Sequence, residues 1–70
     1  MTTELTRREQ QVAALVAQSR TNAEIADALS VSPTTAKWHV SEILRKLCMR
    51  GRVQLAVYAR DRGLSPGLES

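Results

Sequence analysis

The fold is decided by residues 21–47, which read TNAEIADALSVSPTTAKWHVSEILRKL. Two segments in this stretch repeat their apolar residues at helical spacing, and only residues 30–32 separate them. The pair Thr21 and Glu24 forms a capping box that begins the first helix. Ser32 and Pro33 begin the second, because the first helical position needs no N–H donor. A joint this short makes the two helices turn sharply and stay in contact.

Capping signals outside this stretch predict two more helices. Thr6 and Glu9 form another capping box, and the helix that follows is predicted to end around residues 18–20. A fourth helix begins near Arg52 and stops at Gly63, which we expect to be a left-handed C-cap. No segment has the pattern of a strand. We therefore predict an all-α domain with four helices.

Two helices joined by so short a turn form the helix-turn-helix, whose second member enters the DNA major groove, although plain helical bundles contain such pairs as well. In the helix over residues 33–47, one side is apolar and consists of Ala36, Val40, Ile43 and Leu47. The opposite side carries Lys37, Trp38, Ser41, Glu42 and Arg45.

Trp38 needs an explanation because indoles are usually drawn into protein cores. Either it packs on a loop or under its neighbours, or it covers a base edge or a sugar in the groove. In the second case Lys37, Ser41 and Arg45 donate to the bases and phosphates around it.

The charge of the chain favours a polyanionic partner. The net charge of the 70 residues is +3, and the excess is uneven: residues 31–70 carry seven Lys and Arg against three acids, whereas residues 1–30 carry three against four. A basic half suits nucleic acid or an anionic membrane face. The longest apolar run, residues 12–17, is far shorter than the roughly 20 residues that span a bilayer.

Other classes of function find little support. His39 and Cys48 are too few for a metal site, so we expect neither a metal nor a cofactor. No nucleophile motif surrounds any serine, and we expect no enzymatic activity. A lone cysteine cannot form an internal disulfide; we expect Cys48 to be a buried, inert thiol and the protein to be cytoplasmic.

The fourth helix has two apolar sides. One fits the domain's own core and consists of Leu55, Tyr58, Ala59 and Arg62. The other repeats the same spacing without a second core to receive it, and consists of Val53, Ala56, Val57 and Arg60. A few exposed aliphatic residues are common on any surface.

Taken together, these positions resemble the LuxR-type helix-turn-helix, the DNA-binding domain of bacterial quorum-sensing regulators and of NarL/FixJ response regulators. The motifs that carry the resemblance are Leu5-Thr6-x-Arg8-Glu9, Thr21-Asn22-x-Glu24-Ile25-Ala26, Leu29-x-Val31-Ser32, Thr35-x-Lys37-x-His39 and Lys46-Leu47. The likeness covers residues 4–64, which we take as the domain, and residues 52–59 look most like the response-regulator branch. Residues 65–70 look like a flexible tail.

The resemblance implies that the third helix is the recognition helix, with base-reading positions at Lys37, Trp38 and Ser41. It also implies contacts to the DNA backbone, to which we add Arg45: the positions are Thr21, Thr34, Arg45, Lys46 and Arg52. The second apolar side of the fourth helix becomes a homodimer surface on DNA, formed by Val53, Ala56, Val57 and Arg60.

We therefore expect the effector domain of a bacterial transcription regulator that binds specific double-stranded DNA. RNA polymerase is a further partner, no membrane is involved, and the bound protein lies on the nucleoid. The alternative is a small interaction or dimerisation module that keeps the fold without specific DNA contacts. Four residues depart from the family. Ser19 and Cys48 stand where relatives favour glycine, Ala36 replaces a usual valine, and Ser41 stands where some relatives carry lysine.

Overall fold

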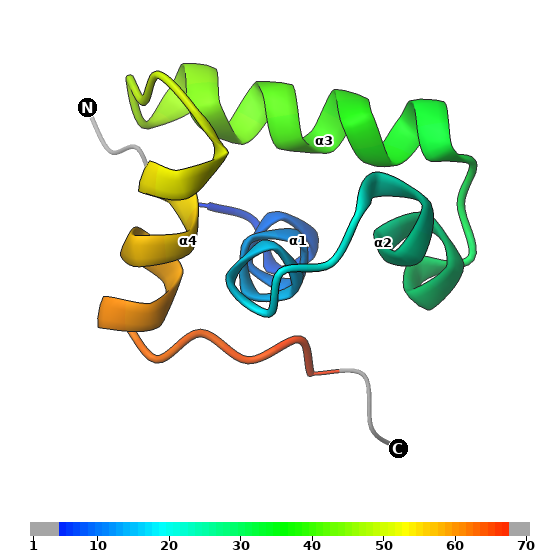
Figure 1. Ribbon diagram of the computed structural model, residues 1–70, viewed down its shortest axis with the longest axis horizontal. Helices are drawn as coiled ribbons and strands as arrows, with labels where there is room; N and C mark the ends of the chain where they lie inside the picture. Colours follow the sequence, from blue (N-terminus) through cyan, green and yellow to red (C-terminus); the bar gives the residue numbers. More distant parts are fainter. Residues whose placement is uncertain (1–4, 68–70) are drawn as a thin grey trace.

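A computed structural model describes residues 5–67, which form four helices. These are α1 (Arg7–Ala17), α2 (Asn22–Leu29), α3 (Pro33–Lys46) and α4 (Arg52–Asp61), and no strand occurs among the described residues. Figure 1 shows α3 along one side of the molecule, with the other three helices on the same side of it and α1 between α2 and α4. The predicted all-α, four-helix fold is confirmed.

The helices begin where the capping signals predict. The Thr6 hydroxyl accepts the Glu9 N–H at 3.1 Å, and the Glu9 carboxylate accepts the Thr6 N–H at 2.9 Å. Thr21 and Glu24 form the same reciprocal pair at the start of α2. At the start of α3 the Ser32 hydroxyl accepts the Thr35 N–H at 3.1 Å. These bonds satisfy backbone donors that a helix leaves unpaired in its first turn.

The core lies around α1, which contacts each of the other helices. Ala13, Ala36 and Ala59 are completely buried, and such small side chains let helices approach closely. Around them lie the larger buried residues Leu5, Val12, Leu15, Val16, Ile25, Leu29, Val40, Ile43 and Leu55. The apolar side predicted for α3 is thus confirmed, with Leu47 partly buried at its end.

The core-facing side predicted for α4 is correct except at Arg62. Leu55 and Ala59 are buried and Tyr58 is partly buried, whereas Arg62 is exposed. Its guanidinium lies 4.5 Å from the centre of the Tyr58 ring. The charge thereby stays in water while the side chain covers an aromatic face.

Beyond α4 the chain turns at Gly63, whose φ of +64° confirms the predicted left-handed conformation. Residues 64–67 have no regular structure and run back past α1 (Figure 1). Residue 4 and residues 68–70, which belong to the predicted domain and tail respectively, lie outside the described residues. None of the helices within residues 5–67 is long and apolar enough to cross a membrane.

The backbone conformation of two turns explains why relatives favour glycine at positions 19 and 48. Ser19 follows α1 with a φ of +64°, and Cys48 follows α3 with a φ of +54°. Glycine adopts this left-handed conformation freely, whereas a side chain is strained there. Cys48 is also exposed, so the prediction of a buried thiol is wrong; a turn just after a helix end stands at the surface.

We expect Ser19→Gly and Cys48→Gly each to raise the free energy of unfolding by about 1 kcal/mol, because each removes a Cβ from a left-handed residue. Urea titration of the purified variants measures the change. Ala28→Gly, on the exposed side of α2, is the control and should lower the same free energy by about 1 kcal/mol. If neither glycine at 19 or 48 stabilises the domain, strain at these turns is not stored in the folded state.

Candidate nucleic-acid interface

The side of α3 that faces away from the core is open to solvent. Lys37, Trp38 and Ser41 are all exposed, and the Trp38 side chain stands out because 58% of its surface remains accessible. Its ring meets the His39 ring in a T-shaped arrangement, with the centroids 5.3 Å apart. Trp38 therefore does not belong to the core. The three residues predicted to read bases lie together on one exposed helical face.

Arg45 lies further along α3 and is paired with Glu42. Its Nη2 donates to the Glu42 Oε1 at 2.6 Å, and 72% of the Arg45 side chain is exposed against 26% for Glu42. The hydrogen bond and the charge of Glu42 raise the pKa of Arg45 above its already high value. The guanidinium is therefore a cation at neutral pH.

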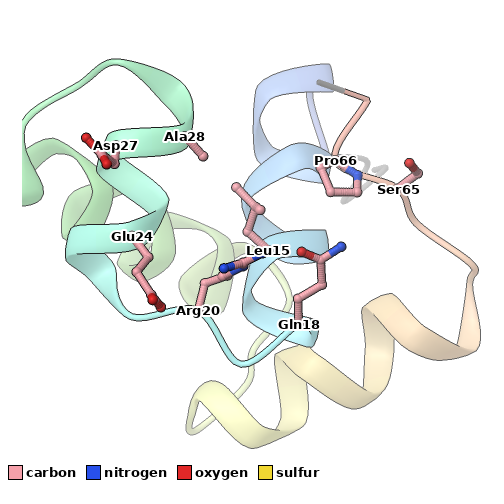
Figure 2. Close-up of a pocket in the computed structure, with 8 residues that line it drawn as sticks. All are labelled: Leu15, Gln18, Arg20, Glu24, Asp27, Ala28, Ser65 and Pro66. Atoms are coloured by element: carbon pink, nitrogen blue, oxygen red, sulfur yellow. The ribbon is translucent and has the colours of Figure 1, made fainter. Parts of the chain in front are cut away.

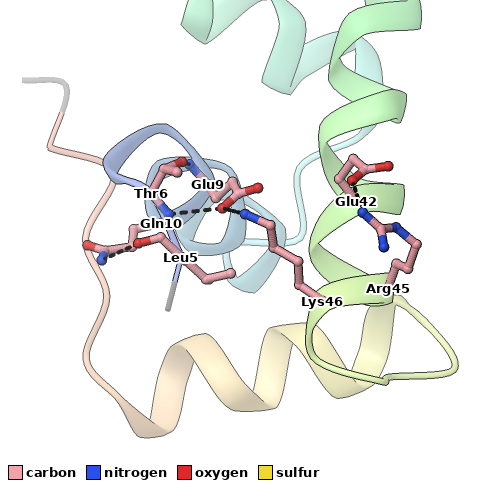
Figure 3. Close-up of polar contacts among 7 residues, drawn as sticks. All are labelled: Leu5, Thr6, Glu9, Gln10, Glu42, Arg45 and Lys46. Carbon is pink, nitrogen blue, oxygen red and sulfur yellow. Dashed lines mark hydrogen bonds and ion pairs between the residues drawn. The ribbon is translucent and has the colours of Figure 1, made fainter. Parts of the chain in front are cut away.

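Lys46, the next residue, leaves α3 in a different direction. Figure 3 shows it reaching across to α1, where its Nζ donates to the Glu9 Oε1 at 2.9 Å. The same carboxylate oxygen accepts the Thr6 N–H, so one buried group caps α1 and holds the C-terminal end of α3. The capping box was visible in the sequence, but the ion pair was not, because 37 residues separate its partners.

The environment of Glu9 keeps its carboxylate charged. Burial alone raises the pKa of this group, since only 7% of the residue is exposed. The hydrogen bond from Lys46, the bond from the Thr6 N–H and the charge of Lys46 together outweigh burial, and the pKa of Glu9 falls below 4.5.

Arg52 joins the start of α4 to the start of α2. It donates to the Asn22 Oδ1 at 2.8 Å and to the backbone oxygen of Arg20. Thr21, the N-cap of α2, is exposed beside Asn22, and Thr34 is exposed in the first turn of α3. The structure thus brings Thr21 and Arg52 to one region, while Thr34 lies at the far end of α3 from Lys46.

The second apolar side of α4 is only partly free. Val53 is 77% exposed and Val57 is 49% exposed. Ala56, by contrast, packs against the core, and the Arg60 guanidinium donates to the Ala17 oxygen at the end of α1 at 3.4 Å. Two valines are therefore the apolar surface that α4 presents to solvent.

An open groove lies on the side of α1 and α2 that faces away from α3. Figure 2 shows its lining residues, among which Arg20 carries a positive charge and Glu24 and Asp27 carry negative charges. Leu15, Gln18, Ala28, Ser65 and Pro66 complete it. Within residues 5–67 no group of three or more His, Cys, Asp and Glu side chains gathers in one place.

Comparison with known proteins identifies the family to which the sequence is similar. The family model of bacterial regulatory proteins of the luxR family matches residues 3–59. The chain is 44% identical over 55 residues to the transcriptional regulatory protein LiaR of Bacillus subtilis, covering 79% of this chain and 26% of LiaR. It is 42% identical over 60 residues to the response regulator protein VraR of Staphylococcus aureus, covering 86% and 29%. The chain spans about a quarter of the length of these relatives.

We expect Glu9→Gln to lower the free energy of unfolding at pH 7 by about 1–3 kcal/mol, because Lys46 then has only a neutral acceptor. The pKa of Glu9 is lowered in the folded state, so its contribution is complete above pH 4.5 and is lost as pH falls through the folded pKa. The gap between wild type and variant therefore closes below pH 4.5.

Urea titrations at pH 7, 5, 4 and 3 measure this gap. Glu24→Gln is the matched control, since Glu24 has the same place in a capping box but pairs with no cation within residues 5–67. Glutamine also serves in a capping box, so this variant should change stability little at any of these pH values. A gap for Glu9→Gln that stays constant from pH 7 to pH 3 would rule out the ion pair as its source.

Proposed function

The chain belongs to the luxR family of bacterial regulatory proteins and is a helix-turn-helix DNA-binding domain of a transcription regulator; we propose that it recognises a specific double-stranded DNA sequence as the effector domain of a response regulator. Its relatives VraR and LiaR are regulators about three times as long, which fits a domain that acts within a larger protein.

One observation carries this proposal: α3 buries one side and leaves the other uncovered. Ala36, Val40 and Ile43 hold the helix on the core, and Lys37 and Trp38 project from the opposite side. An α-helix fits the major groove of B-DNA, where each base pair presents its own pattern of donors and acceptors. We assign base reading to Lys37, Trp38 and Ser41.

The DNA backbone contacts surround this face. The Thr21 and Thr34 hydroxyls are exposed near the starts of α2 and α3, where free backbone N–H groups favour phosphate. Lys46 uses one N–H for Glu9 and keeps two more donors. Arg52 donates to Asn22 and to the Arg20 oxygen, and its guanidinium has further N–H groups available for phosphate. Both side chains thus tie helices together and add positive charge at the rim of the interface.

We place the working protein in the bacterial cytoplasm, on the nucleoid when it is bound, and its activity in binding rather than catalysis. We include RNA polymerase as a further partner of the transcription regulator. The match to a family of bacterial regulatory proteins supports binding rather than catalysis.

On DNA two copies meet through α4. Val53 and Val57 are exposed apolar side chains on one side of this helix, and Ala56 and Arg60 border them. The area is small, so association costs outweigh it in free solution and DNA brings the copies together. A two-fold contact of this kind gives an inverted repeat as the preferred site.

We expect Trp38→Ala to weaken binding to the selected site by roughly 1–3 kcal/mol while binding to mixed-sequence DNA changes little, because base contacts carry the specificity. The melting temperature should not change, since the indole is mostly exposed. Fluorescence anisotropy at two salt concentrations measures both affinities. Equal weakening on both DNAs would overturn the base-reading role, and wild-type protein that binds neither DNA would support an interaction module instead.

We expect Val57→Glu to abolish cooperative occupancy of an inverted repeat, because two like charges then face each other across the two-fold axis. Binding to one half-site should survive. Gel-shift titrations on single and paired half-sites separate the two effects. Ala28→Glu introduces the same charge on the exposed side of α2, away from α4, and should leave cooperativity intact. If the Val57→Glu variant still binds the inverted repeat cooperatively, α4 does not form the dimer interface.

A further inference from the structure

Arg45 and Glu42 form a charge pair on the recognition helix that the base-reading set Lys37, Trp38 and Ser41 does not use. Figure 3 shows both side chains on α3, on the side away from the Lys46–Glu9 contact, pointing toward each other. From the sequence we expect Arg45 to donate to bases or phosphates and count it among the backbone contacts, whereas Glu42 has no predicted role. Their geometry favours a different assignment.

A carboxylate beside Arg45 on the polar side of α3 disfavours a backbone role, whereas the Glu9 that pairs with Lys46 is a buried residue of α1. A cation that neutralises phosphate gains from its full charge, and a carboxylate at 2.6 Å cancels much of that charge while being repelled by the same phosphates. A cation that reads a base gains instead from a fixed orientation, because a guanidinium recognises a base edge only in one planar arrangement.

The pair supplies that orientation without consuming the guanidinium. Only Nη2 bonds to Glu42, so the other N–H groups of the fork remain free. The side chain is 72% exposed, and no other hydrogen bond or ion pair to it occurs within residues 5–67. The acceptor pattern that matches the free donors of an arginine fork is the O6 and N7 edge of guanine.

Arg45 lies on the same side of α3 as Trp38 and Ser41, because it follows them by seven and four residues. It follows Ser41 by four residues, about one helical turn or roughly 6 Å along the axis. Successive base pairs are about 3.4 Å apart, so Arg45 reaches about two base pairs beyond those near Ser41.

We propose that Arg45, held in orientation by Glu42, reads a guanine in the major groove about two base pairs beyond the bases that Ser41 faces. Arg45 is a specificity-determining residue, and Glu42 is a positioning residue that acts through it. This assignment rests on the proposed DNA-binding function and extends the reading face of α3 by one turn.

The test begins with selection of bound sequences from a random DNA pool by the wild-type 70-residue protein. Affinities are then measured for the selected site and for each single base-pair change. We expect Arg45→Ala to lose about 5- to 150-fold discrimination at one G·C position and to keep its preferences elsewhere. Glu42→Ala should weaken the preference at that same position several-fold while affinity for mixed-sequence DNA rises, because a negative charge has left the interface.

Arg50→Ala is the matched control, since it removes an exposed arginine that lies outside α3. It should leave every base preference unchanged. Arg45 and Glu42 are not among the core residues, so unchanged melting temperatures establish that the variants are folded.

Three results would overturn the inference. Uniform weakening by Arg45→Ala on all sequences, with a salt slope smaller by about one, makes Arg45 a phosphate contact. Loss of the preference in Glu42→Ala but not in Arg45→Ala makes Glu42 the reading group. An unchanged preference in Glu42→Ala shows that Arg45 needs no positioning. If the wild-type protein selects no sequence at all, the proposed function itself is contradicted, and this result is distinct from the other three.

Discussion

The packing of α3 against α1 and α2 holds its apolar side on the core, and the surfaces of the domain depend on that contact. Ala13 and Ala36 are fully buried, and Val12 and Ile43 fill the space around them. Because α3 can bury only one side in so small a core, its other side has no protein to cover it. The exposed tryptophan is a consequence of this arrangement as much as of its own position in the sequence. The same contact sets where α2 and α4 attach, since α1 lies between them (Figure 1).

Electrostatics reinforces the packing on one side of α3 and leaves the other side available. Arg45 and Lys46 are adjacent in sequence and carry the same charge, yet each pairs with a different carboxylate. Lys46 reaches the buried Glu9 and ties the end of α3 to the start of α1. Arg45 pairs with Glu42 in solvent, where such a bond contributes little to stability. One cation therefore serves mainly the fold, and the other is free to serve recognition.

The turns that join the helices show what tight connection requires. Ser19, Ser30 and Cys48 all adopt left-handed backbone conformations within two residues of a helix end, as does Gly63. Such residues reverse the chain within one or two positions and so keep the helices in contact. Three of the four carry side chains, so the domain holds strain at its turns that glycine would relieve.

The sequence by itself determined the helices and their order, because capping boxes, a proline at the first helical position and apolar periodicity are local signals. It also determined the two sides of α3, since spacing along one helix fixes which residues share a face. What only the tertiary structure decided are the pairings between distant residues: Lys46 with Glu9, Arg52 with Asn22 and Arg60 with the end of α1. Basic residues look alike in a sequence, and which of them finds a partner depends on the angles at which the helices cross.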